Sequence, residues 1–237
     1  MRVIIIDDER LARSGMRSLL AKYDDVEVVD EANNVDEAFD KIIALNPEVI
    51  FLDIQMPGKS AFELLEMLPR TPLVVFATAY DEYAIKAFET NALDYLLKPI
   101  EPKRLDACIE KLRGQLESKP NSPEDRLKEG DRVFVKDGER CWFVQLSDIR
   151  MFESEGNYVK VYFEGETPLI HRSLNALDEK LDDKAFFRAS RKYIINLRWI
   201  DKIEPWFNGG LMVKLKNGES VEISRRQAVK FKEMLSI

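Results

Sequence analysis

The first half of the chain alternates short apolar runs with segments of helical spacing. The runs are near-continuous, as is typical of strands that are covered on both faces. They are Val3–Ile6, Val26–Val29, Val49–Leu52, Leu73–Ala77 and Tyr95–Leu97. The helical sets between or after them are Leu11, Met16, Leu19 and Leu20; Val35, Ala38, Phe39, Ile42 and Ile43; Ala61, Leu64, Leu65 and Leu68; and Leu105, Ile109 and Leu112. This alternation predicts an α/β domain with a five-stranded parallel sheet and helices on both faces.

The second half is rich in β-branched and aromatic residues and carries hairpin signals. Asp137-Gly138 and Asn217-Gly218 each separate two apolar stretches, and such pairs supply the positive φ angles of tight hairpin turns. The expected strands are Arg132–Lys136, Cys141–Gln145, Ile149–Phe152, Tyr158–Phe163, Tyr193–Asn196, Ile200–Pro205, Leu211–Leu215 and Ser220–Ile223. Two helices are expected over Ser173–Leu181 and Arg225–Leu235, the second with Ser224 as its N-cap. We therefore predict a mainly-β second domain.

A polar stretch with two prolines, Arg113–Asp131, separates the halves and is typical of a linker. We place a first domain over residues 1–117, the linker over 118–131 and a second domain over 132–237.

Few cysteines and short apolar runs narrow the functional class. Cys108 and Cys141 lie in different predicted domains, which fits a reducing cytoplasm better than a disulfide framework. With His171 as the single histidine, zinc and Ser-His-Asp sites lack support. No apolar run approaches the roughly 18 residues that span a membrane. Two aspartates end the first run after Ile6, so we expect a buried strand rather than a signal peptide and a cytoplasmic protein without a membrane partner.

Charge is distributed unevenly along the chain, whose net charge is −7. Residues 1–118 hold 14 Lys and Arg against 23 Asp and Glu, whereas residues 119–237 hold 22 against 20. The second half also has a basic cluster, which consists of Arg188, Arg191, Lys192, Arg198 and Lys202. Because the local field matters more for DNA than the total charge does, the acidic balance does not exclude nucleic acid as a partner. A solvated, charge-mixed surface is the alternative explanation of this cluster.

Five polar side chains follow strands of the predicted parallel sheet. Asp7 and Asp8 follow the first, Asp53 the third, Thr78 the fourth and Lys98 the fifth. The carboxyl ends of parallel strands form one rim, where ligands bind, so these side chains should converge. Each residue alone is commonly a turn, cap or solvated residue. Five together on one rim indicate a site.

Three carboxylates at close range repel one another, and a cation relieves that repulsion. A donor set of hard oxygens without sulfur or imidazole favours Mg²⁺. Phosphoryl transfer needs its oxygens neutralised by a metal on one side and a cation on the other, which suits Lys98 and the Thr78 hydroxyl. An aspartate can act as the nucleophile in such a transfer. A phosphatase or another hydrolase is an alternative, but a substrate pocket and a general acid are missing, so we expect no enzyme acting on a separate substrate.

Four motifs resemble the receiver domains of two-component response regulators. They are Ile6-Asp7-Asp8-Glu9, Leu52-Asp53-Ile54-Gln55-Met56-Pro57-Gly58, Ala77-Thr78-Ala79 and Leu97-Lys98-Pro99, and the resemblance covers about residues 1–117. It implies a flavodoxin-like sheet with strand order 2-1-3-4-5. Ser60-Ala61 stands where receivers usually have a glycine after the Met-Pro-Gly turn.

The resemblance also implies the roles of individual residues. Asp53 would take phosphate from a sensor histidine kinase. Asp8, Asp53 and the backbone carbonyl of Gln55 would hold Mg²⁺, with Asp7 acting through water. Thr78 and Lys98 would bind the phosphoryl oxygens, and Lys98-Pro99 would be a cis peptide.

A switch follows from the same resemblance. Tyr95 matches the family's switch aromatic, although an ordinary half-exposed strand residue is the alternative. If Thr78 moves to bond the phosphate, Tyr95 can turn inward. That movement would remodel the surface made by an Asp81–Thr90 helix, the last strand and the last helix of the domain.

The second half resembles the LytTR DNA-binding domain over about residues 132–235. The matching pieces are Phe152-Glu153-Ser154-Glu155-Gly156-Asn157-Tyr158-Val159, Phe187-Arg188-Ala189-Ser190-Arg191-Lys192-Tyr193-Ile194-Ile195-Asn196 and Ile223-Ser224-Arg225-Arg226. That family sends loops into successive major grooves. Its contact positions fall on Asn157, Arg191, Asn196 and Arg226, and we add Arg188 and Lys192 as candidate phosphate contacts. Ser190 stands where the family often has His.

Together these features predict a phosphorylation-dependent, DNA-binding response regulator that controls transcription. Its expected partners are a sensor histidine kinase, double-stranded DNA and a second copy of the chain, which forms a homodimer on phosphorylation. Linking two weak DNA-binding domains raises avidity without new contacts. A protein-interaction output without DNA binding remains the alternative from a different class.

Overall fold

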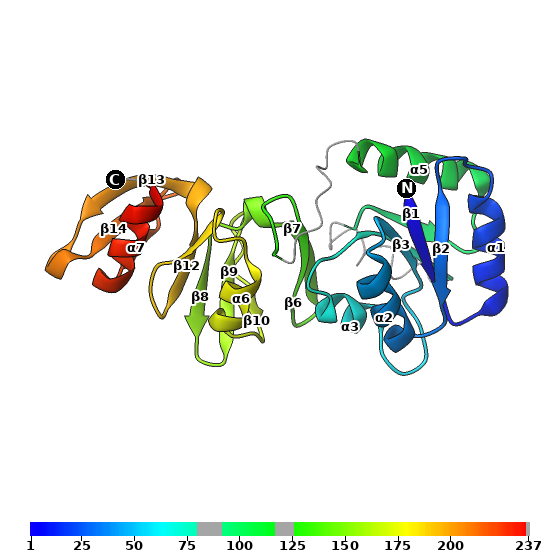
Figure 1. The fold of residues 1–237 in the computed structure, drawn as a ribbon. Coiled ribbons are helices and arrows are strands. Elements are labelled where there is room, and N and C mark those ends of the chain that lie inside the picture. Colours follow the sequence, from blue (N-terminus) through cyan, green and yellow to red (C-terminus); the bar gives the residue numbers. More distant parts are fainter. Residues whose placement is uncertain (80–91, 117–125, 236–237) are drawn as a thin grey trace. The chain divides into compact units, whose positions relative to one another are not determined.

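The computed structural model describes residues 1–79, 92–116 and 126–235 (Figure 1). The helix expected over Asp81–Thr90 lies outside the described residues. Contacts divide the chain into two compact units. Of the described residues, the first unit holds 1–116, 132–134 and 138–143, and the second holds 126–131, 135–137 and 144–235. The division therefore falls inside the first hairpin after the linker.

The first unit is built on a five-stranded sheet in the order β2-β1-β3-β4-β5, as the sequence predicted (Figure 1). All neighbouring strands run parallel. The strands are β1 (Arg2–Ile6), β2 (Glu27–Ala32), β3 (Val49–Leu52), β4 (Leu73–Thr78) and β5 (Asp94–Leu97). The apolar run predicted for this part of the chain ended at Val29, but β2 continues to Ala32 through polar residues. An edge strand tolerates such residues, so the apolar pattern alone did not show the end of the strand.

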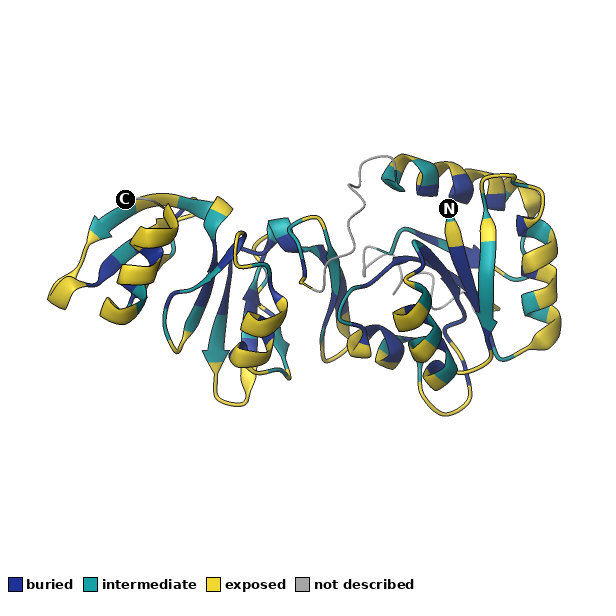
Figure 2. Ribbon diagram, in the orientation of Figure 1, coloured by how far each residue is buried: buried dark blue, intermediate teal, exposed yellow. Residues whose placement is uncertain are grey.

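Helices cover both faces of this sheet. They are α1 (Arg10–Leu20), α2 (Val35–Leu45), α3 (Ala61–Met67) and α5 (Pro102–Leu116). Because successive strand residues point to opposite faces, Ile4 and Ile6 join one buried cluster with α2 and α3, whereas Val3 and Ile5 join another with α1 and α5. Figure 2 shows the strands as largely buried and the outer faces of the helices as exposed. The two apolar layers leave the strand ends as the polar rim.

Polar side chains fix the starts of two of these helices. Asn34 accepts a hydrogen bond from the backbone N–H of Glu37 at the start of α2. Ser60 and Glu63 form a capping box at the start of α3, each side chain accepting from the other's backbone N–H. Ser60 therefore has a local structural use at the position where receivers usually carry glycine.

The rest of the chain is mainly β, as predicted. A five-stranded sheet has the order β10-β9-β8-β12-β11, a three-stranded sheet the order β13-β14-β15, and β6 pairs with β7. The strands are β6 (Arg132–Asp137), β7 (Arg140–Gln145), β8 (Met151–Glu155), β9 (Tyr158–Tyr162), β10 (Leu169–Ile170), β11 (Phe186–Arg188), β12 (Tyr193–Asn196), β13 (Ile200–Pro205), β14 (Leu211–Leu215) and β15 (Ser220–Ile223). The helices are α6 (Leu174–Lys180) and α7 (Arg225–Leu235), with single turns η1 (Leu146–Asp148), η2 (Leu197–Trp199) and η3 (Phe207–Gly209).

The predicted hairpin turns are present, since Gly138 and Gly218 have φ angles of 60° and 101°. Strands β10 and β11 were not predicted, because two and three residues are too few to show a periodicity. Cys108 and Cys141 are both buried, and neither forms a disulfide bond. Within the described residues, no helix is long and apolar enough to cross a membrane.

Candidate functional site

Three acidic residues of the first unit meet at the carboxyl ends of β1 and β3. These strands are neighbours in register, with Ile6 opposite Leu52, so the residues that follow each strand leave the sheet side by side. One carboxylate oxygen from each of Asp7, Asp8 and Asp53 lies within 4.8 Å of the others. Asp7 and Asp53 are buried, at 4% and 7% exposure. The structure thus brings together the three carboxylates that the strand pattern placed on one rim.

Backbone hydrogen bonds continue the sheet into this site. The N–H of Asp53 donates to the carbonyl of Ile6 at 2.9 Å, and that of Asp7 donates to the carbonyl of Ala32 at 3.1 Å. The Asp7 Oδ1 atom then accepts from the backbone N–H of Glu9 at 2.9 Å. Burial raises the pKa of the Asp7 carboxyl above its usual value, although bonds to Lys98 and Glu9 oppose the shift. The cost of keeping this buried carboxylate charged favours a cation at the site.

Lys98 closes the site from β5. Its Nζ atom lies 2.5 Å from Asp7 Oδ2 and 2.7 Å from Asp53 Oδ2. The Lys98–Pro99 peptide is cis, as the receiver resemblance implies. Burial acts to lower the pKa of Lys98, but hydrogen bonds to Asp53 and Asp7 outweigh it and raise the pKa, so the side chain is an ammonium. A partly buried cation, 20% exposed, therefore already faces the predicted phosphoacceptor.

Thr78 and Tyr95 lie close by on β4 and β5. Thr78 lies opposite Leu97 in the β4–β5 register. Leu97 immediately precedes Lys98 in the sequence, so Thr78 lies next to the start of the segment that carries Lys98. Its hydroxyl is buried and has no hydrogen-bond partner among the described residues, which is uncommon for a buried polar group. Tyr95 is partly buried against the cluster that includes α2 and α3. The Thr78 hydroxyl is thus positioned at the rim with its donor capacity unused.

Gln55 belongs to an open cleft beside the carboxylates, whose lining includes Asp8, Asp53 and Lys98. Its backbone N–H donates to Asp53 Oδ1 at 3.3 Å. The available donors for an ion are therefore oxygens from Asp7, Asp8, Asp53 and the local backbone. This hard donor set fits Mg²⁺.

A second group of candidate residues gathers at one end of the sheet with the order β10-β9-β8-β12-β11. The β12–β8 register pairs Tyr193 with Glu153, and the N–H of Ser154 donates to the Lys192 carbonyl at 2.8 Å. The N–H of Ser224 donates to the Ala189 carbonyl at 3.1 Å. The β8–β9 turn, the β11–β12 loop and the start of α7 therefore meet at one edge. We call these three segments the loop edge.

Three predicted DNA contacts are exposed on the loop edge. Asn157 lies in the β8–β9 turn, Arg191 in the β11–β12 loop, and Arg226 in the first turn of α7. Arg225 beside it is also exposed. Cations at a helix N-terminus are unfavourably placed against the helix dipole. An anionic partner would compensate for that placement.

Arg188 and Lys192, the two candidate phosphate contacts, already bond to neighbouring residues within the domain. Arg188 donates through Nε to the carbonyl of Ser190 at 2.7 Å and through Nη2 to that of Arg191 at 3.1 Å. Lys192 pairs with Glu153 at 2.7 Å, and its Nζ lies 5.3 Å from the centre of the Tyr193 ring. Arg188 thus holds the shape of the loop that presents Arg191, a role that its place in a basic cluster did not indicate.

Asn196 requires a correction. The expectation that it contacts DNA is wrong, because Asn196 is fully buried at the end of β12 away from the loop edge. Its side-chain amide donates to the carbonyls of Ile149 at 2.9 Å and Leu146 at 3.3 Å, and its oxygen accepts from the N–H of Arg198 at 2.9 Å. These bonds join β12, η1 and η2, so Asn196 is a structural residue.

Glu153 was not predicted as a site residue. Its carboxylate accepts hydrogen bonds from the hydroxyls of Tyr162 and Tyr193 and pairs with Lys192. A lone glutamate in a strand gives no sequence signal for this role, which depends on the pairing of β8 with both β9 and β12.

Comparison with known proteins agrees with both halves of this geometry. The model of the response regulator receiver domain matches residues 3–110, and that of the LytTr DNA-binding domain matches residues 139–236. The sensory transduction protein LytT of Enterococcus faecalis is 34% identical over 241 residues, and the transcriptional regulatory protein BtsR of Escherichia coli is 36% identical over 242 residues. Both alignments cover 100% of this chain and 100% of the relative.

Among solved structures, the LytTr DNA-binding domain of a putative methyl-accepting/DNA response regulator from Bacillus cereus is 25% identical. It matches with a TM-score of 0.43 and covers 45% of this chain and 97% of that one.

Proposed function

Because this chain belongs to the family of response regulators that join a receiver domain to a LytTR DNA-binding domain, we propose that a sensor histidine kinase phosphorylates Asp53 and thereby controls its binding to DNA. The observation that carries the proposal is the position of Asp53, which lies 2.7 Å from the partly buried ammonium of Lys98 and beside two further carboxylates. A nucleophile, a metal site and a cation thus occupy one rim.

Asp8, Asp53 and the backbone carbonyl of Gln55 would hold Mg²⁺, with Asp7 acting through water. Mg²⁺ bound there supplies positive charge that neutralises the phosphoryl oxygens during transfer. The three carboxylates repel one another without it. Their oxygens, within 4.8 Å of one another, support this assignment.

Asp53 is the nucleophile. One carboxylate oxygen forms a bond to phosphorus while the bond from phosphorus to the kinase's histidine nitrogen breaks, and the electron pair stays on nitrogen. The product is an acyl phosphate on Asp53. Lys98 moves its hydrogen bond from the Asp53 carboxylate to a phosphoryl oxygen, and Thr78 donates its unused hydroxyl to another. The chain thus takes part in its own phosphoryl transfer rather than turning over a separate substrate.

The output follows from a shift between two conformations. Movement of Thr78 toward the phosphoryl group opens space for Tyr95, whose ring already packs partly against the core. We infer that this change favours a homodimer, which brings two loop edges onto paired DNA sites. The dimer raises affinity through effective concentration.

The loop edge is the DNA-binding surface of this proposal. Arginine can bond guanine with two hydrogen bonds, and asparagine can bond adenine in the same way. Arg191, Arg226 and Asn157 are exposed there and have the required chemistry. Arg188 positions the loop from behind through the carbonyls of Ser190 and Arg191.

Labelling tests the receiver half of the proposal. Asp53→Asn abolishes labelling of the full-length chain by acetyl phosphate with Mg²⁺, whereas Asp40→Asn, which changes an exposed carboxylate on α2, leaves it intact. Undiminished labelling of the Asp53 variant overturns the assignment.

Selection of genomic DNA with phosphorylated and unphosphorylated protein tests the output half, and mobility shifts measure the affinity for the selected sites. Arg191→Ala and Arg226→Ala weaken binding by about 1–3 kcal/mol each. Lys216→Ala removes an exposed cation from the turn at the opposite end of β14 and leaves affinity unchanged. If no DNA is enriched in either state, an output through protein interaction replaces this half of the proposal.

A further inference from the structure

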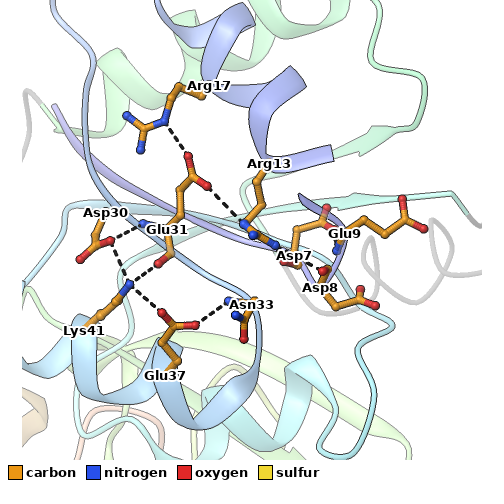
Figure 3. Close-up of polar contacts among 10 residues, drawn as sticks. All are labelled: Asp7, Asp8, Glu9, Arg13, Arg17, Asp30, Glu31, Asn33, Glu37 and Lys41. Carbon is orange, nitrogen blue, oxygen red and sulfur yellow. Dashed lines mark hydrogen bonds and ion pairs between the residues drawn. The ribbon is translucent and has the colours of Figure 1, made fainter. Parts of the chain in front are cut away.

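Arg13 links the acidic site to the edge of the sheet (Figure 3). It lies on α1, and its Nη1 atom donates to the backbone carbonyls of Asp7 at 2.7 Å and Asp8 at 3.3 Å. Its Nε atom donates to Glu31 Oε2 on β2 at 3.2 Å. The side chain is 13% exposed. One guanidinium therefore holds the segment that carries two of the three carboxylates.

Glu31 is itself fixed from several sides (Figure 3). Its second carboxylate oxygen accepts a hydrogen bond from Arg17 Nε at 2.6 Å. Its backbone carbonyl accepts from Lys41, which is held by Asp30 and Glu37 on the other side. Contacts from α1 and α2 thus hold Glu31, which in turn holds the guanidinium that donates to the carbonyls of Asp7 and Asp8.

We propose that Arg13, oriented by Glu31, is a positioning residue that sets the Mg²⁺ affinity of the site by fixing the β1–α1 loop. The inference rests on the proposed function, because it needs Asp7 and Asp8 to serve the metal. A fixed loop presents their carboxylates together, whereas a loose loop must be ordered when the ion binds. Residues that orient metal ligands typically change affinity by roughly 10- to 100-fold when they are mutated.

Charge alone predicts the opposite sign. The guanidinium is positive, so its removal would make the site more negative and strengthen the binding of a cation. Glu31 offsets part of that charge at 3.2 Å. Orientation and charge can therefore be separated by whether the Mg²⁺ affinity of Arg13→Ala falls or rises. Arg13→Lys adds a second test, because it keeps the charge and loses the planar fork of the guanidinium.

The test is a calorimetric titration of the unphosphorylated full-length chain with MgCl₂. Arg13→Ala and Arg13→Lys each weaken Mg²⁺ binding by roughly 10- to 100-fold. Glu31→Gln also weakens it, because Arg13 loses its ionic anchor; the lost negative charge acts in the same direction, so the sign of the effect in the Arg13 variants decides between orientation and charge. Arg10→Ala removes the same charge from an exposed position on the same helix and leaves affinity within about twofold. Wild-type or tighter binding in either Arg13 variant overturns the inference.

A second readout covers variants that fold poorly. Saturating Mg²⁺ raises the melting temperature of the wild type because the ion binds the folded state. This rise is smaller in Arg13→Lys and Glu31→Gln, and an unchanged rise in both overturns the inference even when Arg13→Ala does not fold.

Asp8→Asn separates failure of this inference from failure of the proposed function. If Asp8→Asn lowers Mg²⁺ affinity but the Arg13 variants do not, the metal site stands and the inference falls. If the wild type does not bind Mg²⁺, or Asp8→Asn binds it equally well, both fall.

Discussion

Lys98 Nζ lies 2.7 Å from Asp53 Oδ2, so the end of β5 meets the end of β3 across β4. The ammonium is held by two carboxylates, since Asp7 Oδ2 lies 2.5 Å away. In the proposed transfer, a phosphoryl group on Asp53 would draw this ammonium to its own oxygens. The pair would then rearrange once the transfer is complete.

The first prediction concerns Lys98→Gln. This change removes the cation that faces the transferred group but retains a hydrogen-bond donor, so labelling of Asp53 by acetyl phosphate slows by at least about tenfold. Initial rates at saturating Mg²⁺ provide the measurement. Lys103→Gln, at an exposed position on α5, is the matched control and labels at the wild-type rate. Equal rates in both variants would remove Lys98 from the mechanism.

The sequence predicted the receiver sheet and its rim well because their signals are local and repeated. Buried parallel strands have near-continuous apolar runs, and the polar residue after each run lies at the same edge. Asp53 and Lys98 could thus be placed together although 45 residues separate them. The edge strand β2 was predicted short because Asp30 and Glu31 interrupt its apolar run, and the contact from Arg13 to Glu31 was missed with it.

The DNA contacts of the second domain were harder to predict, because the role of each residue there depends on the direction in which its side chain points. Asn196 and Arg191 lie five residues apart in one motif, yet Asn196 is buried and Arg191 is exposed. Neither hydropathy nor charge distinguishes an asparagine that bonds carbonyls inside the domain from one that faces DNA. The pairing of β12 with β8 decides it, and that pairing is long-range.

The second prediction follows from the burial of Asn196. Asn196→Ala leaves the carbonyl of Ile149 and the N–H of Arg198 without their hydrogen-bond partners. We therefore expect the free energy of unfolding to fall by about 2–4 kcal/mol. Urea unfolding of the full-length chain measures the loss. DNA affinity, measured at a temperature where the variant is folded, stays at the wild-type value. Normal stability with weakened DNA binding would restore a direct contact.

The third prediction separates Arg188 from Arg191 by the salt dependence of DNA binding. Arg191→Ala lowers affinity and removes one cation from the DNA interface, so the slope of log K against log salt falls by about one. Arg188→Lys keeps the charge but loses the fork that holds the carbonyls of Ser190 and Arg191, so affinity falls while the slope is unchanged. A reduced slope in Arg188→Lys would show a phosphate contact instead.

The last prediction concerns Asp94 at the start of β5, which is 7% exposed. Arg104 Nη1 donates to Asp94 Oδ2 at 2.7 Å, and Lys111 lies 3.3 Å from Asp94 Oδ1. Burial acts to raise the pKa of Asp94, but the bonds to Arg104 and the charge of Lys111 outweigh it and lower the pKa below its usual 3.8. Asp94→Asn therefore destabilises the first unit at neutral pH, by about 1.5–3 kcal/mol for a hydrogen bond to a charged group.

The sign of the pH dependence follows from the direction of that shift. A carboxyl with a lowered folded-state pKa stabilises the fold fully above its unfolded value, and this contribution is lost as the pH falls through the folded-state pKa. The difference in the free energy of unfolding between the wild type and Asp94→Asn should therefore be constant from pH 7 to pH 5 and shrink below pH 3.8. Urea unfolding of both proteins at pH 7, 5 and 3 measures it. A difference that grows on acidification would mean that Asp94 is protonated near neutrality, and the ion pair with Arg104 would then not hold β5 against α5.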